Sequence, residues 1–295
     1  MRVTVGSNTG LSEQVENVFT MLKKARKQNP DKKIYIFGTT VHNPNYLEQY
    51  KDYNFETVED LGEIRKLSKT LKNAVVIFSS EGVEEQVEAN LKSRGVKYYD
   101  ATYTRVKTIR KAIKKELNKS RQVIYIGDEK AYETQVSRSL SDKIIFIDTN
   151  ENDLSKYQFK KNAVIFNSIL LDELRITRLV GKIKEIQPNI EYVENYSPIL
   201  VSRQENFQEV GNHYYLVLVG NKNSTSIQAL LDYEKIFYPD RPHLVFSKPE
   251  EVEEFVNIYG IDYDKSVFIN SGTSTTTEET LAVAEYFKKL KKPKN

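Results

Sequence analysis

Three loops of this chain combine polar residue types with the positions from which α/β proteins do chemistry. Asp100–Val106 separates a strand-like run at 95–99 from a helical run. Glu194–Ser197 and Ser7–Ser12 likewise follow strand-like runs and precede helical ones. In α/β sheets, the loop at the carboxyl end of a strand is where ligands bind. Three such loops, spaced about evenly, predict one site built by three similar units.

Several kinds of chemistry are excluded by what the chain lacks. It has no cysteine, which excludes disulfides, thiolate nucleophiles and clusters held by cysteine sulfur. It also has no Gly-rich phosphate loop and no pair of His residues at metal-ligand spacing. A Ser-His-Asp set does not assemble, and the aromatic residues do not alternate with a basic stripe. We therefore predict no cofactor, no metal site and no nucleic-acid partner.

Composition favours a cytoplasmic protein with packed cores. Apolar residues make up 39% of the 295 residues, and charged residues (29%) nearly balance at a formal +3. The basic tail 288–294 is most simply a solubilising terminus. No apolar run approaches the roughly 20 residues that span a bilayer, and Met1–Gly6 lacks the apolar segment of a signal peptide. We therefore expect no membrane partner.

Short apolar runs alternate with segments of helical period along the whole chain. The predicted strands are Arg2–Val5, Lys33–Phe37, Ala74–Phe78, Val96–Tyr99, Val123–Ile126, Lys143–Ile147, Ala163–Phe166, Glu191–Val193, Tyr214–Val219, His243–Phe246 and Ser266–Asn270. The predicted helices are Leu11–Gln28, Val83–Ser93, Thr104–Asn118, Leu170–Ile186, Leu200–Glu209, Ser226–Tyr233, Pro249–Tyr259 and Thr277–Leu290. This alternation predicts the α/β class, with mainly parallel sheets covered by helices on both faces.

The pattern divides into three blocks of about a hundred residues. We predict a first domain at 12–99, a second at 100–194, and a third that joins 1–11 to 195–295. The opening strand, Arg2–Val5, precedes the first block and is not part of it. It can complete the third sheet, because the termini of a domain often lie close together.

The motifs of this chain resemble those of the LytB/IspH family of hydroxymethylbutenyl diphosphate reductases. Thr40–Pro44 is similar to the family's "(I/V)HN" loop. Ser79–Val83 resembles "AHGV" with the His replaced by Glu81. Asp100–Tyr103 resembles "DATC" with the Cys replaced.

The resemblance continues in the same order along the rest of the chain. Ile126–Glu133 is similar to "G…HPE", and Asn167-Ser168 stands in the place of "TT". Tyr196–Gln204 resembles "TIC…RQ", Val219–Ser226 resembles "VGGKNSSN", and Ser271–Thr275 resembles "AGAST". One such motif alone would be weak evidence for the resemblance. Eight motifs in the same order, over nearly the whole chain, are specific evidence for it.

The resemblance implies a trefoil of three pseudo-equivalent α/β domains around a central cleft. In the family, one Cys from each domain holds an iron–sulfur cluster that reduces an allylic alcohol bearing a diphosphate. The three cluster positions here are Ser12, Tyr103 and Ser197. A cluster needs soft, ionised thiolates, and hydroxyl groups near neutral pH are neither. Tyr103 either fills the vacated space, which we favour, or points its hydroxyl at a ligand.

The family's diphosphate pocket implies ligand-binding roles for His42, Asn167, Ser224, Thr225, Ser226 and Ser274. Ser226 stands where the family has Asn, and Ala131 replaces a second His. Glu81 puts a carboxylate where a phosphate would need a donor, so the original substrate should bind badly unless Glu81 is protonated or turns away. Ordinary N-capping is the alternative role for the Ser and Thr residues, and a buried structural role is the alternative for His42.

Glu133 stands at the family's proton-relay position. It is either a retained site residue or a surface carboxylate, and the sequence does not separate these two interpretations.

Three hypotheses follow. The first is a LytB/IspH-like pseudoenzyme without a cluster, inactive as a reductase, that binds a small polar or phosphorylated ligand or acts through a protein partner. The second is a cluster-free enzyme that uses Glu81 and Glu133 as acid and base. The third is a structural or regulatory partner whose cleft is filled by Tyr103 and Phe166. The family's own activity, 4-hydroxy-3-methylbut-2-enyl diphosphate reductase of isoprenoid biosynthesis, is the remaining alternative.

Overall fold

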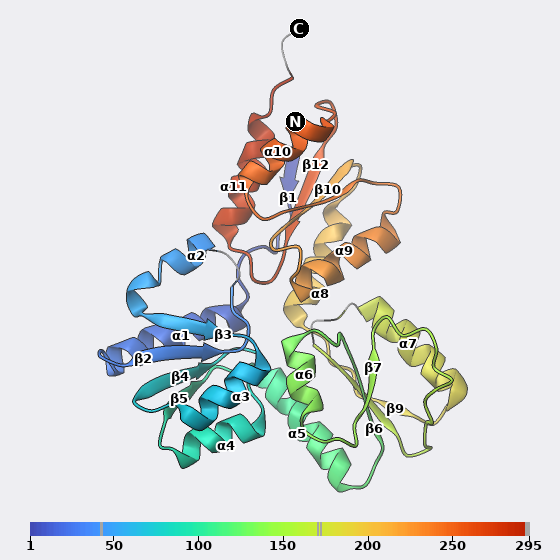
Figure 1. The fold of residues 1–295 in the computed structure, drawn as a ribbon. Helices are drawn as coiled ribbons and strands as arrows, with labels where there is room; N and C mark the ends of the chain where they lie inside the picture. The colour runs from blue at the N-terminus through green and yellow to red at the C-terminus, as the bar shows by residue number, and fades with distance from the viewer. Residues whose placement is uncertain (42–43, 170, 172, 293–295) are drawn as a thin grey trace. The chain divides into compact units, whose positions relative to one another are not determined.

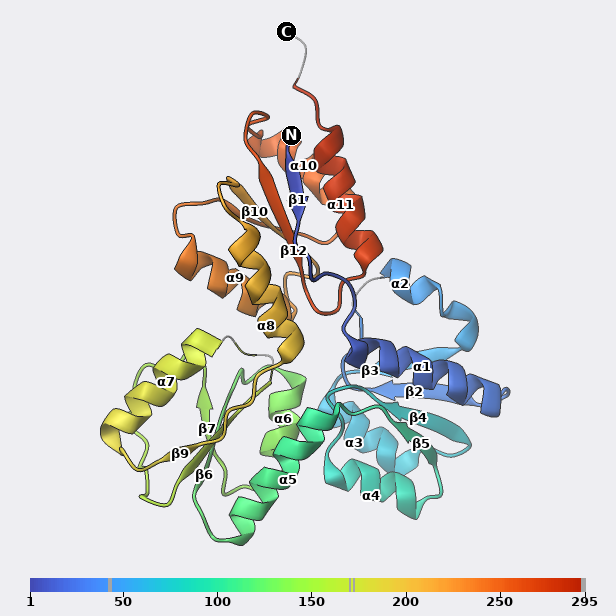
Figure 2. The same cartoon turned by 180° about the vertical axis from the view of Figure 1, so that it is seen from behind.

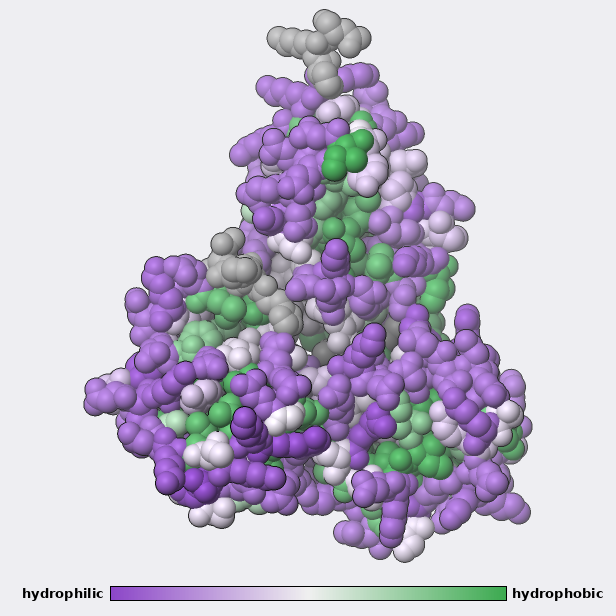
Figure 3. Space-filling model, viewed as in Figure 1, coloured by the Kyte–Doolittle hydropathy of each residue, from purple (hydrophilic) through white to green (hydrophobic). Residues whose placement is uncertain are grey.

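The fold is α/β, as predicted, and contains three four-stranded sheets in which every pairing is parallel (Figure 1). The computed structural model describes residues 1–41, 44–169, 171 and 173–292. Among these residues no helix is both long and apolar enough to cross a membrane. The outward surfaces of the helices are mostly hydrophilic (Figure 3).

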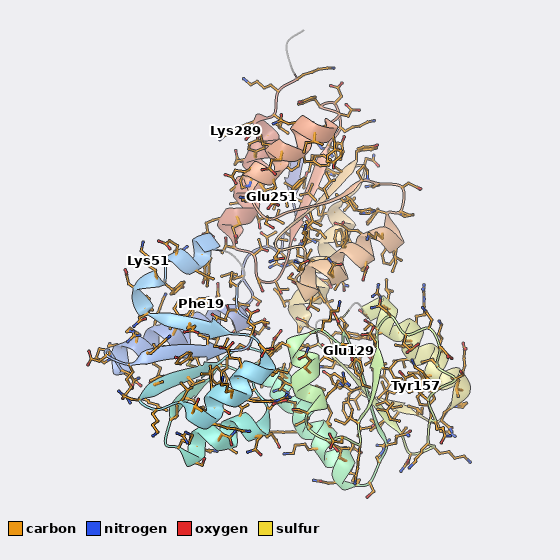
Figure 4. All side chains as sticks on the ribbon, in the orientation of Figure 1. Phe19, Lys51, Glu129, Tyr157, Glu251 and Lys289 are labelled. Carbon is orange, nitrogen blue, oxygen red and sulfur yellow. The ribbon has the colours of Figure 1, made fainter. Side chains whose placement is uncertain are left out.

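The first sheet has the strand order β3-β2-β4-β5. Its elements are α1 (Glu13–Gln28), β2 (Lys33–Phe37), α2 (Pro44–Glu48), the 3₁₀ helix η1 (Lys51–Tyr53), β3 (Phe55–Val58), α3 (Leu61–Thr70), β4 (Ala74–Phe78), α4 (Glu85–Ser93) and β5 (Lys97–Asp100). Figures 1 and 2 show α1 on one face of this sheet and α3 and α4 on the other. Phe19 of α1, labelled in Figure 4, contacts the ring of Tyr50 with 4.6 Å between centroids.

The second sheet has the order β7-β6-β8-β9. Its elements are α5 (Thr104–Asn118), β6 (Val123–Gly127), α6 (Tyr132–Arg138), β7 (Ile145–Asp148), β8 (Val164–Asn167), α7 (Glu173–Ile186) and β9 (Glu191–Tyr192). Helix α5 forms because Val106, Ile109 and Ile113 recur at helical spacing and bury one stripe. Phe166 lies in the core of this domain, so the hypothesis that it fills a cleft is wrong.

The third sheet has the order β1-β12-β10-β11. Its elements are β1 (Val3–Val5), α8 (Pro198–Glu205), the 3₁₀ helix η2 (Asn206–Glu209), β10 (Tyr215–Val219), α9 (Thr225–Phe237), β11 (His243–Phe246), α10 (Pro249–Tyr259), β12 (Val267–Ser271) and α11 (Thr277–Lys289). Strand β1 pairs with β12, which confirms that the opening strand completes this sheet. The Thr4 hydroxyl also contacts Nε2 of buried His213 at 2.8 Å.

The chain separates into two compact units. One comprises Met1–Ser12, Val41–Tyr46 and Tyr196–Asn295 and holds the third sheet. The other comprises Glu13–Thr40 and Leu47–Asn195 and holds the first and second sheets together. The first and second predicted domains therefore share one packed unit, whereas the exact domain limits stay predictions.

Helix α6 joins the two sheets of this larger unit. Its Tyr132 and Val136 belong to the hydrophobic core of the first domain, beside Phe37 and Phe78. Between α5 and α4, Lys114 forms an ion pair with Glu85 at 2.6 Å. Packing across this boundary is therefore both apolar and charged.

The sequence did not predict β3, α3 and α6, nor the short helices α2 and η1. Strand β3 contains only two strongly apolar residues, and α6 is too short for a helical period to be recognised. Helix α3 is different, because Leu61, Ile64 and Leu71 follow a helical pattern behind an Asp60 N-cap, so its signal was present.

Candidate functional site

The carboxyl ends of β2 and β4 bring polar side chains together at one edge of the first sheet. These strands are neighbours, and Thr39 and Glu81 lie in the loops that follow them. The Thr39 hydroxyl donates a 2.6 Å hydrogen bond to Glu81 Oε2. Gly38 permits this arrangement, because a Cβ there would lie 2.2 Å from Ser79 Oγ.

The loop that carries Glu81 is held in place by the second domain. Arg110 of α5 donates a 2.5 Å hydrogen bond to the Glu81 carbonyl oxygen, and its Nε donates to Ser137 Oγ of α6 at 3.4 Å. The Tyr103 amide donates to the Ser80 carbonyl at 2.8 Å. Gly82 adopts a φ of +74°, and a Cβ there would lie 2.7 Å from Arg110 Nη1. The backbone of the Glu81 loop is thus fixed at the strand end.

Glu133 is buried, with 4% of its surface exposed, so the surface interpretation of this residue is wrong. The Tyr125 hydroxyl donates to both of its carboxyl oxygens, at 2.7 and 2.9 Å. Ser137 donates to Glu133 Oε1 at 2.7 Å. Burial, and then the charge of Glu133, raise the pKa of the Tyr125 phenol. Helix α6 therefore turns Glu133 into the second domain, where hydroxyl groups satisfy it.

The Glu81 carboxyl holds its proton unusually tightly. Burial raises its pKa to about 7, and the charges of Glu133 and Glu59 add to this effect. The hydrogen bond from Thr39 and the charge of Arg110 oppose it only partly. Near neutral pH, the group therefore exists in both protonation states and is chemically suited to accept or donate a proton.

Tyr132 contributes a second unusual group to this boundary. Its side chain is buried, and its hydroxyl has no hydrogen-bond partner among the described residues. Burial and the charge of Glu81 raise the pKa of this phenol. An unpaired buried hydroxyl costs free energy, and here the charge of Glu81 acts on it as well.

Asn167 has internal partners for its whole amide. Its Nδ2 donates to the carbonyl oxygens of Ser168 and Asn195, at 2.9 and 2.8 Å, and Tyr192 donates to its Oδ1 at 3.1 Å. A ligand at Asn167 would have to displace one of these bonds. The ligand-binding role of this residue stays a prediction.

In the smaller unit, the carboxyl ends of β10 and β12 bring the predicted Ser and Thr residues together. Ser224 caps α9 by accepting from the Ile227 amide at 3.2 Å, and its hydroxyl lies 3.4 Å from that of Ser226. Ser226 in turn accepts from the Thr273 amide at 3.2 Å. Thr225 and Ser274 are partly exposed at the same edge. Capping therefore accounts for Ser224, while Thr225 and Ser274 are partly exposed residues that carry hydroxyl groups.

The start of α11 completes this edge. Thr276 and Glu279 form a reciprocal capping box, at 3.1 and 2.7 Å. Two helices of thirteen residues thus begin beside each other at this end of the sheet. Such ends attract anions, although the capping box already uses two of the donors of α11.

Buried Arg203 supports the loop that leads to Ser12. Its guanidinium donates to the carbonyl oxygens of Asn8 and Gly10, and its Nε has no hydrogen-bond partner in the described chain. Burial lowers the pKa of this group to about 10. Sequence reasoning did not single out Arg203, although it stands in the segment that resembles "TIC…RQ".

The residues at the three predicted cluster positions do not fit an iron–sulfur cluster. Ser12 is buried and its amide donates to Thr273 O at 2.8 Å. Ser197 accepts from the Leu200 amide at 3.4 Å as the N-cap of α8, and Tyr103 is a partly exposed phenol. Hard hydroxyl oxygens stand where the cluster needs thiolates. Within the described ranges, no three His, Asp or Glu side chains are grouped to hold a metal ion.

One predicted site residue cannot be placed, and four residues of the site were not predicted from the sequence. His42 lies outside the described residues. Thr39, Arg110, Tyr125 and Ser137 were missed. Thr39 could have been found, because it directly follows a predicted strand. The other three act through contacts between helices and strands that no local pattern reveals.

Comparisons with known proteins agree with this fold. The LytB protein family model matches residues 3–288. A protein of Symbiobacterium thermophilum named 4-hydroxy-3-methylbut-2-enyl diphosphate reductase is 25% identical over 268 residues, 90% of this chain and 89% of its own. A protein of Neorickettsia sennetsu with the same name is 26% identical, over 78% of this chain and 75% of its own. This chain belongs to the LytB family.

Solved structures show the same fold. The E-1-hydroxy-2-methyl-but-2-enyl-4-diphosphate reductase of Plasmodium falciparum superimposes with a TM-score of 0.82 at 17% identity. The superposition covers 95% of this chain and 86% of that one. A second reductase structure superimposes with a TM-score of 0.64 at 20% identity, over 98% of this chain and 100% of that one.

Proposed function

We propose that this protein is a LytB-family pseudoenzyme that carries no iron–sulfur cluster, does not reduce a diphosphate substrate, and binds a small polar or phosphorylated ligand. One observation carries the proposal: hydroxyl-bearing residues replace all three cluster cysteines in a chain that has no cysteine. Without thiolates the fold has no site for an electron carrier of the family's kind. Its loops of Ser and Thr residues nevertheless persist at the strand ends.

Ligand binding rests on the polar edges of the two units. Thr225 and Ser274 offer hydroxyl groups beside two helix starts, which suit a phosphate or another anion. At the first sheet, Thr39 and Glu81 offer a hydroxyl group hydrogen-bonded to a carboxyl group instead. A protein partner remains the alternative route by which an inactive family member would act.

The test is an anaerobic reconstitution with iron and sulfide, with the Symbiobacterium relative treated in parallel as the positive control. We expect the relative to gain a visible chromophore and stoichiometric iron, and this protein to gain neither. We also expect no reductase activity above a protein-free blank. Stoichiometric iron and sulfide with a reducible chromophore in this protein would contradict the proposal.

A cluster-free acid–base enzyme is a second candidate, favoured by one observation. The carboxyl groups of Glu81 and Glu133 lie in the same unit, and the charge of Glu133 contributes to the raised pKa of Glu81. Glu133 is fully hydrogen-bonded, so Glu81 is the better proton carrier of the two. Turnover of a hydroxylated substrate that is lost in both Glu81→Gln and Glu133→Gln would favour this candidate over the pseudoenzyme.

A further inference from the structure

Strand β11 is an outer edge of the third sheet, and alternate backbone groups along it face away from that sheet. Among the described residues it pairs with β10 alone. Amides of β10 and of the residue after it donate to the carbonyl oxygens of Pro242 and Phe246, at 3.0 and 2.9 Å. Alternate residues of the strand therefore face β10, and the backbone N–H and C=O groups of His243 and Val245 face outward.

The side chains of β11 leave this edge open to another strand. Charged side chains commonly protect edge strands, and β3, β5 and β7 each carry at least one. Within the described ranges, β11 is an edge strand of four residues that has no Lys, Arg, Asp or Glu. His243 turns toward α9 instead of the edge, because its Nδ1 lies 3.2 Å from Oε2 of buried Glu234.

Exposed apolar side chains flank β11 on both faces of the sheet. The last two residues of α9 and of α10 are large, apolar and 48–75% exposed: Ile236, Phe237, Ile258 and Tyr259. The two helices cover opposite faces, because their buried residues belong to different cores. Phe255 of α10 packs against Phe246 of β11, with 5.7 Å between ring centroids. Exposed apolar groups beside an open strand are typical of a surface that binds protein.

The outward groups of β11 indicate what binds there. In an antiparallel pair, two outward-facing residues that lie opposite each other exchange both of their backbone hydrogen bonds. Because His243 and Val245 are two positions apart, β11 is complementary to itself. His243 of one copy meets Val245 of a second copy, and Val245 of the first meets His243 of the second. Such a pair is twofold symmetric, with Leu244 of both copies at the axis.

The charges beyond the strand ends favour the same register. It brings Asp240 of each copy opposite Lys248 of the other, and both residues are exposed and have no ion pair within the described residues. Moving the axis to Val245 would bring Asp240 opposite Glu250 instead, which places like charges together. Moving it to His243 would leave both charges without an opposite partner.

We propose that β11 is the interface of a homodimer, in which it pairs antiparallel with β11 of a second copy and joins two four-stranded sheets into one. This inference goes beyond ligand binding and does not depend on it. The twofold axis keeps α9 of both copies on one face of the joined sheet and α10 of both on the other. The exposed apolar ends of these helices then add apolar area to the backbone pairing.

Sedimentation equilibrium at about 50 mM salt tests this pairing through its charges. The variants are Asp240→Lys, Lys248→Asp and the double variant that exchanges the two charges. Each single variant places like charges together at both ends of the paired strands, so we expect a dissociation constant at least about tenfold higher than that of the unchanged protein. The double variant should return to within about threefold. Asp142→Lys, the same charge change on an exposed residue of the second domain, should leave association unchanged.

Amide hydrogen exchange read by NMR provides a measurement specific to the strand, and it needs no variant. The His243 and Val245 amides should become protected as the protein concentration rises, because they bond to the second copy. The Leu244 amide faces β10 and should keep the same protection at every concentration.

Three results would overturn the proposed pairing. The first is a protein that stays monomeric at about 200 µM. The second is a dimer whose dissociation constant is the same in every charge variant, because another surface would then hold it. The third is a double variant that associates no better than the single ones, because the two charges would then not lie opposite each other.

Discussion

A carboxyl group that is partly buried beside other acidic groups binds its proton more tightly in the folded state than in the unfolded state, and Glu81 is such a group. Its pKa is raised to about 7 from an ordinary value of 4.5. Below pH 4.5 the Glu81 carboxyl is protonated in both the folded and the unfolded protein, so its burial does not lower the free energy of unfolding. Between pH 4.5 and pH 7 the unfolded state ionises first, so the free energy of unfolding falls as pH rises.

Glu81→Gln should remove this penalty. We expect the variant to be more stable than the unchanged protein at pH 8, by up to about 3 kcal/mol, and of equal stability near pH 4.5. Urea unfolding at several pH values measures the difference, with Glu185→Gln, the same charge change on exposed α7, as the matched control. A variant that is less stable at pH 8 would show that the carboxylate is favourably bound in the folded protein.

Helix α6 shows how a short element decides the geometry around it. Its Tyr132 packs into the first domain against Gly38, while the next residue, Glu133, turns toward Tyr125 of its own domain. Adjacent residues of a helix point in directions about 100° apart, so one turn can contact two cores. This helix therefore couples the first domain to the second.

Gly38→Ala should disturb this contact. A Cβ would lie 2.2 Å from Ser79 Oγ and 2.9 Å from the Tyr132 ring, at a φ of +101°. We expect a loss of about 2–4 kcal/mol in the free energy of unfolding. Gly95→Ala is the control, because Gly95 also has a positive φ but no atom within 4 Å of its Cβ, so it should lose about 1 kcal/mol. Equal losses would mean that backbone strain alone matters at Gly38.

At the scale of the whole molecule, the chain forms two compact units, and in each of them arginine side chains hold loops through backbone carbonyl groups. Arg203 bonds to Asn8 and Gly10 in the smaller unit. Arg26 of the larger unit donates to a set of loop carbonyl oxygens, at 2.6–3.2 Å: Asn29, Pro30, Lys32, Tyr53 and Asn54. Neither guanidinium is used in the proposed ligand chemistry.

Arg203→Ala and Arg26→Ala should destabilise different units. Each leaves backbone carbonyl groups unsatisfied, and we expect losses of about 2–4 kcal/mol. Hydrogen exchange read by mass spectrometry should show faster exchange in β1 and α8 for Arg203→Ala, and in α1 and β2 for Arg26→Ala. Faster exchange throughout the chain in both variants would mean that the two units unfold as one.

Much of the fold could be predicted because its signals are local. The strands 33–37, 74–78 and 243–246 and the helices 104–118 and 249–259 have the bounds that were predicted. Pro249 at the start of α10 and the Ser224 cap of α9 also follow from neighbours in the sequence. The candidate residues Glu81 and Ser226 were found through motifs, which are local as well.

The sequence by itself determined the α/β class, the joining of β1 to the third sheet, the family, and the lack of thiolates for a cluster. Each depends on residue type and spacing along the chain. Only the tertiary structure decided that Glu133 is buried, that Arg110 holds the Glu81 loop, and that Tyr132 lies against Gly38. Burial and proton affinity depend on atoms that are distant in sequence and close in space, so no local pattern of residues contains them.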